Sequence, residues 1–188
     1  MAHSRSPYTV RKQQVIQIGM TPIINWLKTN THGFDHLSNE EVNAISDFSL
    51  LWSLFEARIL NTRGSARAIC DAVDGWLNAG VLDIQVLAPE LAYFQQRYFA
   101  DGDFTYHFHH LHFRNNDQQA LVEAVIEGSN TNPRDQVAAA LIIVFRFRNN
   151  LFHGVKWQYQ LADQLGNFTA ANNALMKVLE KHGTLAEG

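Results

Sequence analysis

Cysteine is almost missing from this 188-residue sequence: Cys70 stands alone, so the chain cannot form an intramolecular disulfide. A chain of this kind suits a reducing cell interior. Long apolar runs are missing too, because the longest, residues 137–145, is far shorter than the roughly 20 residues of a membrane-spanning helix. Residues 1–7 also lack the apolar core of a signal peptide. We therefore expect a cytoplasmic protein that does not enter a membrane.

Charge is sparse as well. Charged residues make up 18% of the chain, and the formal net charge of −3 argues against a protein that coats nucleic acid nonspecifically. A small basic cleft stays compatible with that value, since net charge says little about local potential. Apolar residues are abundant, at 46% with 12 Phe and 4 Trp. This composition predicts a substantial aromatic core in one domain, with or without an N-terminal extension.

One long helix is predicted after Ser38. Ser38 and Glu41 form a capping-box pattern, in which the serine caps the helix and the glutamate reaches back to it. The helix is expected to run to about residue 61. Its core face is marked by apolar residues at helical spacing, namely Ile45, Phe48, Trp52, Phe55 and Ile59.

A second long helix is predicted from Asn132 to His153. Asn132 is a good N-cap, and Pro133 fits the first helical position. Gly154 follows His153 and predicts the end of the helix.

The rest of the chain is also predicted to be helical, so the expected fold class is all-α. Further helices are expected over residues 10–28 (broken or restarted at Pro22), 65–79 (closed by Gly80), 89–99, 117–127 and 159–182 (kinked at Gly166). Loops or turns are expected over residues 29–37, 101–103 and 128–132. Residues 104–113, rich in His, Phe and Tyr, fit a short strand, an irregular loop or part of a helix.

The end of the second long helix carries a motif. Arg148-Asn149-Asn150-Leu151-Phe152-His153 is followed at once by Gly154. An arginine, a polar residue directly after it, and a histidine a few residues on, near the end of a long apolar helix, resemble the signature of the HEPN family. Residues 51–56, Leu-Trp-Ser-Leu-Phe-Glu, look like the first long helix of such domains.

The resemblance implies an all-α, HEPN-like antiparallel helical bundle over residues 38–182. Residues 1–37 would be a partly helical N-terminal extension, and residues 183–188 a tail. HEPN domains that cleave RNA usually form homodimers, with two motif helices facing one another across a shared cleft. The resemblance therefore implies an endoribonuclease that acts on RNA without metal or cofactor. Nucleases of this kind often serve as toxins or in defence, and an antitoxin would then be a further partner.

The residue types fit that chemistry. RNA is cut when its own 2′-hydroxyl attacks the adjacent phosphate, leaving a 2′,3′-cyclic phosphate. The reaction needs a proton carrier near neutral pH, the role expected for His153. It also needs fixed positive charge where negative charge builds on the phosphate, the role expected for Arg148. Asn149 is expected to position the phosphate or the imidazole.

Helix geometry complicates this assignment. At about 100° per residue, Arg148 and His153 lie about 140° apart and do not share a face. Arg146 and Asn149 do share the face of His153. The polar residue after Arg148 favours that arginine as catalytic, and Arg146 is expected to help bind phosphate. A distorted last helical turn, or a dimer, would relieve the mismatch.

The remaining site residues are predicted around this motif. Asn150 and Lys156 are expected to bind substrate, although fraying of the helix end explains Asn150 equally well. Glu56 is expected to support the site by holding an arginine of the motif helix, and an ordinary solvated glutamate is the alternative.

Two other functions fit the sequence. One is a noncatalytic HEPN module that binds RNA or nucleotide or scaffolds a partner. The other is an unrelated helical protein whose segment 107–112, with four histidines, binds a transition metal. No acidic or cysteine ligand lies close to that segment in the sequence, which favours aromatic packing or stacking on nucleobases. Cys70 is most simply a core residue.

Overall fold

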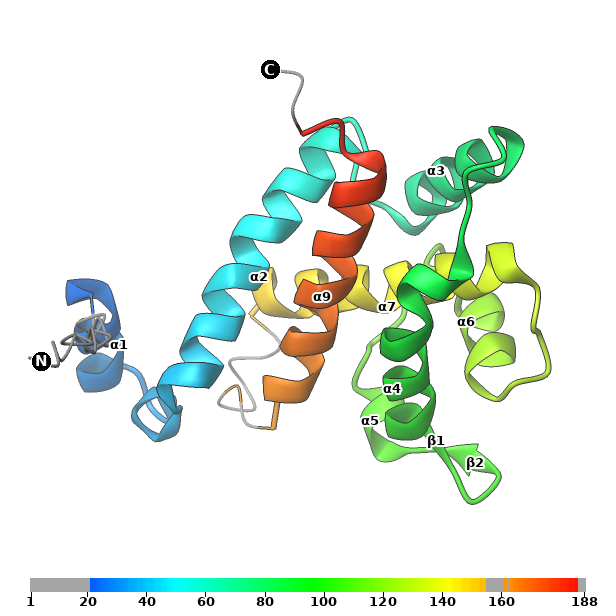
Figure 1. The fold of residues 1–188 in the computed structure, drawn as a ribbon. Coiled ribbons are helices and arrows are strands. Elements are labelled where there is room, and N and C mark those ends of the chain that lie inside the picture. The colour runs from blue at the N-terminus through cyan, green and yellow to red at the C-terminus, as the bar shows by residue number, and fades with distance from the viewer. Residues whose placement is uncertain (1–20, 155–160, 162, 186–188) are drawn as a thin grey trace, which may run out of the picture. The chain divides into compact units, whose positions relative to one another are not determined.

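The fold is almost entirely helical, as predicted (Figure 1). A computed structural model describes residues 21–154, 161 and 163–185. The chain forms two compact units, residues 1–35 and 36–188, each described by itself below. Among the described residues, no helix is long and apolar enough to cross a membrane.

The N-terminal unit contains helix α1, Pro22–Asn30. Thr21 caps it, and its proline occupies the first turn, as the sequence predicted for a helix restarting at Pro22. The helix continues two residues past the expected end, Lys28, and the expected part before residue 21 lies outside the described residues. No residue of α1 is buried, and Ile23 and Trp26 are well exposed. The predicted loop that follows contains a short 3₁₀ turn, η1, Phe34–His36.

Helices α2 (Asn39–Arg58) and α9 (Leu165–His182) pack against each other. The capping box at Ser38 is present in full, and the stripe on α2 buries Phe48, Trp52 and Phe55. Phe48 meets Phe168 with ring centroids 5.1 Å apart. Residues 159, 160 and 162 of the predicted last helix lie outside the described residues.

The predicted kink at Gly166 is wrong, because the glycine lies in the first turn of α9. A Cβ at that position would come within 2.5 Å of the Tyr93 hydroxyl oxygen. The glycine therefore allows a close approach by α4.

Three further helices follow α2 in the chain: α3 (Ala66–Asn78), the 3₁₀ helix η2 (Ile84–Leu87) and α4 (Ala88–Tyr98). Ser65 caps α3 and Gly80 follows its end with φ +70°, as predicted. The expected turn at residues 101–103 joins the two strands of a small hairpin, β1 (Phe99–Ala100) and β2 (Asp103–Phe104). Gly102 has φ +85° there, a conformation that favours glycine. Residues 104–113 thus begin in a strand and continue into helix α5, Tyr106–His109.

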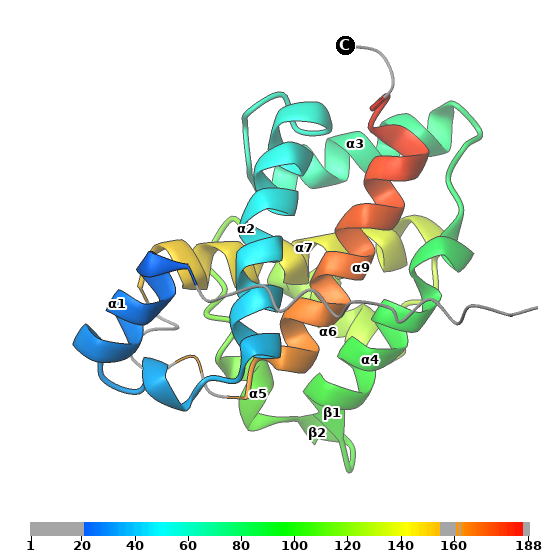
Figure 2. The same cartoon turned by 60° about the vertical axis from the view of Figure 1, so that its left-hand side comes forward.

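Helices α6 (Gln119–Ile126) and α7 (Pro133–Phe152) complete the fold. Asn132 caps α7 as predicted. The sequence wrongly placed Asp117 in the helix that is α6. Asp117 precedes this helix and is buried. Helix α7 passes behind α2 and α9 in both views (Figures 1 and 2) and also packs against α3 and α6. It is buried along residues 137–151 except at Arg148, so it is the centre of the core.

Candidate functional site

The predicted motif lies on the last two turns of α7. The helix is continuous through Phe152, and the His153 backbone N–H donates to the Asn149 carbonyl at 2.9 Å. Gly154 then turns the chain with φ +78°. The His153 side chain is exposed. No distortion brings it toward Arg148, so one copy of the chain keeps the two side chains on different faces of the helix.

Arg148 lies against α2. Its Nη2 is 3.8 Å from Glu56 Oε2, its Nη1 donates to Asn149 Oδ1 at 3.1 Å, and its guanidinium lies 5.6 Å from the centre of the Phe152 ring. The side chain keeps 29% exposure. Arg148 Nε is buried and has no hydrogen-bond partner among the described residues. The ion pair between this guanidinium and Glu56 is therefore long and partly open to solvent, and it leaves N–H groups of Arg148 without a close acceptor in the described part of the chain.

Glu56 lies where the sequence predicted, beside an arginine of the motif helix. Its carboxylate accepts hydrogen bonds from Trp52 Nε1 at 2.8 Å and from the Gly64 backbone N–H at 3.0 Å. A Cβ on Gly64 would collide with Glu56 Oε1. Two hydrogen-bond donors and the absence of a side chain on Gly64 thus hold this carboxylate in place, 3.8 Å from Arg148 Nη2.

Arg146 does not fit the expected contact with phosphate. It is 1% exposed, and its Nη1 donates to Asp117 Oδ2 at 2.6 Å. The other donors reach the carbonyls of Leu111, at 3.0 Å, and His112, at 2.5 Å. Burial lowers the pKa of this guanidinium, and the Asp117 charge opposes that shift. The side chain is fully used in holding the chain before α6, so RNA has no access to it in this conformation.

Asn150 has a similar structural position. It is 1% exposed, and its Nδ2 donates to the carbonyls of His110 and Leu111 at 3.0 and 3.1 Å. Asn149 is also buried, with its side-chain oxygen turned to Arg148. This placement favours a structural role for Asn150 over the expected contact with substrate. Lys156 lies outside the described residues.

Arg146 and Asn150 donate hydrogen bonds to the backbone of residues 106–116, called here the histidine segment. The segment comprises α5 and the turns after it, with Phe108 and Leu111 buried. Tyr106, His109, His112 and Arg114 are exposed. Among the described residues, no group of three or more His, Cys, Asp or Glu side chains is placed to hold a metal ion.

Asp117 and Gly64 were not singled out as site residues by the sequence. Asp117 is the first acidic residue after a stretch of thirteen without one, residues 104–116. Arg146 and Asn150, four residues apart in an apolar helix, share a face and so signal a buried polar partner. No sequence pattern distinguishes Gly64 from an ordinary loop glycine.

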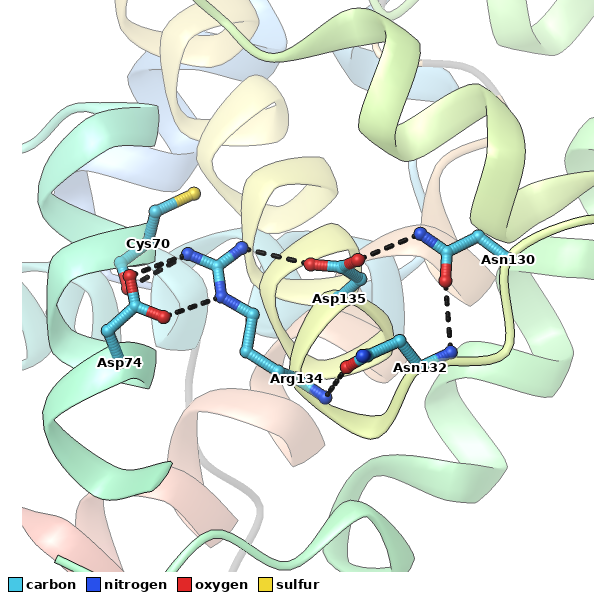
Figure 3. Close-up of polar contacts among 6 residues, drawn as sticks. All are labelled: Cys70, Asp74, Asn130, Asn132, Arg134 and Asp135. Atoms are coloured by element: carbon cyan, nitrogen blue, oxygen red, sulfur yellow. Dashed lines mark hydrogen bonds and ion pairs between the residues drawn. The ribbon is translucent and has the colours of Figure 1, made fainter. Parts of the chain in front are cut away.

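The opposite end of α7 carries a closed polar network (Figure 3). Arg134 donates to both carboxylate oxygens of Asp74 on α3, at 2.7 and 2.9 Å, and to Asp135 at 3.1 Å. Asn130 joins Asp135 to the loop before the helix. Cys70 contributes its carbonyl to Arg134, and burial raises the pKa of its thiol. The network fastens α7 to α3.

The comparisons with known proteins leave the family open. No protein-family model, curated protein or solved structure matches this chain.

Proposed function

We propose that this chain is a HEPN-type endoribonuclease that needs no metal, with its reaction centre at the C-terminal end of α7. The observation that carries the proposal is Arg148: a partly exposed cation, paired with the fixed carboxylate of Glu56, in the same motif as the exposed His153. A preorganised cation beside a proton carrier is what phosphoryl chemistry on RNA requires.

In this mechanism the RNA 2′-hydroxyl gives its proton to a neutral His153 imidazole. The 2′-oxygen forms a bond to phosphorus while the bond from phosphorus to the 5′-oxygen breaks. The leaving oxygen takes a proton from a second imidazole in its protonated form. Arg148 stabilises the charge that builds on the phosphate oxygens. The products are a 2′,3′-cyclic phosphate and a 5′-hydroxyl.

A homodimer supplies the second imidazole. Arg148 and His153 face different directions on a regular helix, so two copies whose motif helices face each other would bring both histidines and an arginine to one shared site. Phe152, at 56% exposure, lies between them in sequence and offers apolar surface for such a contact. Cellular RNA is the proposed substrate, in the setting of a toxin or defence effector.

The test is incubation of labelled RNA with the protein in EDTA. We expect cleavage to persist and to leave 2′,3′-cyclic phosphate ends, and His153→Ala to abolish it. His182→Ala is the matched control, since His182 also stands at the C-terminal end of a helix, stacked on Trp76. Activity lost on chelation, 3′-hydroxyl products, or equal activity of His153→Ala and wild type would each refute the proposal.

A noncatalytic HEPN module that binds RNA or nucleotide, or scaffolds a partner, is the second candidate. The observation in its favour is that Arg148 already has an acidic partner, Glu56, and an amide acceptor, Asn149. Under this alternative, RNA binds in EDTA but stays intact.

A further inference from the structure

The histidine segment, residues 106–116, packs against one face of α7. His153 lies at the end of that face. Arg146 and Asn150 donate to three consecutive backbone carbonyls of the segment, those of His110, Leu111 and His112. His112 adopts φ +52°, a conformation that non-glycine residues rarely take. A buried arginine therefore holds a strained backbone in place, which makes the segment a fixed part of the surface.

His153 continues this face of the helix. It follows Arg146 by seven residues and Asn150 by three, which places it about 20° and about 60° around the helix axis from them. The two buried side chains point at the histidine segment, and His153 comes one turn later, where the helix ends and its side chain is exposed. The exposed histidine therefore comes next along the face of α7 that meets the segment.

The segment offers flat rings and positive charge to solvent. Tyr106 is 69% exposed, and its ring centroid lies 4.1 Å from that of His110. His109, His112 and Arg114, further along the segment, are exposed as well. Residues 104–116 include no acidic residue, and the next one, Asp117, is buried against Arg146. Among the described residues, the Asp163 carboxylate does approach the segment, with its Oδ2 4.0 Å from His107 Nε2.

We propose that the histidine segment is the substrate-binding surface of the proposed ribonuclease, and that its substrate is single-stranded RNA. Unpaired bases have free faces that stack on tyrosine and imidazole rings, whereas a duplex hides those faces. Arg114 pairs with a backbone phosphate of the same strand. The segment thus presents nucleotides that flank the scissile phosphate to His153. This inference rests on the proposed function.

The experiment measures binding separately from cleavage, with an unstructured single-stranded RNA whose 2′-hydroxyls are all methylated, so that it cannot be cut. Fluorescence anisotropy gives Kd for wild type, Tyr106→Ala, Tyr106→Phe and Arg114→Gln. Arg67→Gln is the matched control, because Arg67 is an arginine on α3 whose side chain is 89% exposed. Melting curves establish that each variant is folded.

We expect Tyr106→Ala to weaken binding on the order of tenfold, and Tyr106→Phe to restore it because the stacking ring is kept. Arg114→Gln should weaken binding several-fold and lower the salt dependence by about one phosphate contact. Arg67→Gln should leave Kd unchanged. A duplex of the same RNA should bind more weakly than the single strand.

Failure of the inference is distinguishable from failure of the proposed function. If the RNA binds through Tyr106 and Arg114 but unmodified RNA is never cut, the binding surface stands and the ribonuclease is refuted. If His153-dependent cleavage occurs while Tyr106→Ala and Arg114→Gln change neither Kd nor KM, the binding surface is refuted and the ribonuclease stands. Equal effects of Arg67→Gln and Arg114→Gln, or a preference for the duplex, would also overturn the inference.

Discussion

The two ends of α7 each carry an arginine, and the two arginines are bound differently. Arg134, at the N-terminal end, meets both oxygens of Asp74 and one of Asp135, within 3.1 Å (Figure 3). Arg148, near the C-terminal end, has one carboxylate at 3.8 Å and a buried Nε without a partner among the described residues. The first arrangement satisfies the guanidinium, whereas the second leaves it 29% exposed beside one distant carboxylate, so its accessible N–H groups can bind an added anion. On one helix, therefore, an arginine attaches α7 to α3 at one end, and an arginine near the other end can still bind a ligand.

The largest effect is expected from Arg146→Met, in the C-terminal half of α7. This change leaves Asp117 as a buried charge without its partner, and it removes the donors to two carbonyls. We expect the free energy of unfolding to fall by about 3–5 kcal/mol. Urea denaturation measures this loss.

The control for Arg146→Met is the double variant with Asp117→Asn, which removes the stranded charge and should recover part of the loss. A single variant as stable as wild type would show that Arg146 is not the structural arginine of this half of the helix.

The next largest effect compares the arginines at the two ends of α7. Arg148→Ala should lower single-turnover cleavage by about 10²–10³-fold, the usual effect of losing a preorganised donor to the developing charge. Arg134→Ala should lower the melting temperature and leave the turnover of folded protein unchanged, because Arg134 fastens α7 to α3. Single-turnover rates and melting curves of both variants are the measurement. Normal turnover in Arg148→Ala contradicts its assignment.

A smaller effect is expected from Gly64→Ala, which tests the support behind Arg148. The new Cβ would collide with the Glu56 carboxylate, and the required shift should cost about 1–3 kcal/mol in stability. Gly75→Ala is the control, because nothing lies within 4 Å of its added Cβ and the residue is inside α3. That control should gain about 0.5–1 kcal/mol. Both values come from urea denaturation, and a Gly64→Ala protein as stable as Gly75→Ala would mean that Glu56 is not confined.

The smallest effect concerns pH at the N-terminal end. The hydrogen bond from Arg134 lowers the pKa of Asp74 below its ordinary value. A carboxyl whose pKa is lowered by folding stabilises the protein above its unfolded pKa of about 3.9, and this contribution is lost as pH falls through the folded value. The difference in Tm between wild type and Asp74→Asn should therefore be constant near neutral pH and shrink below about pH 4. A difference that grows in acid would contradict the direction of the shift.

Local signals made much of the fold predictable. The capping box at Ser38, the Asn132-Pro133 start of α7 and the glycine after α3 each fix a helix end through neighbouring residues alone. The 3₁₀ helices and the hairpin before α5 were not predicted, since they are short and their ends depend on tertiary contacts.

The candidate site was predictable in part. The family resemblance suggested that Glu56 holds an arginine of the motif helix, with a solvated glutamate as the alternative, and Glu56 does lie 3.8 Å from Arg148. The burial of Arg146 did not, because its partners come from the separate segment before α6. The helix period places an arginine on a face, but it does not say what covers that face.

The position of α7 at the centre of the core also bears on how the protein opens. Its backbone amides over residues 137–151 are surrounded by the helices packed on it, so their hydrogen exchange requires those helices to separate. These amides should be the slowest to exchange in the chain and should report the global free energy of unfolding. Helix α1, with no buried residue, should instead exchange through local fraying alone. Exchange rates along α7 thus measure the free energy needed to separate the helices that pack around the motif helix.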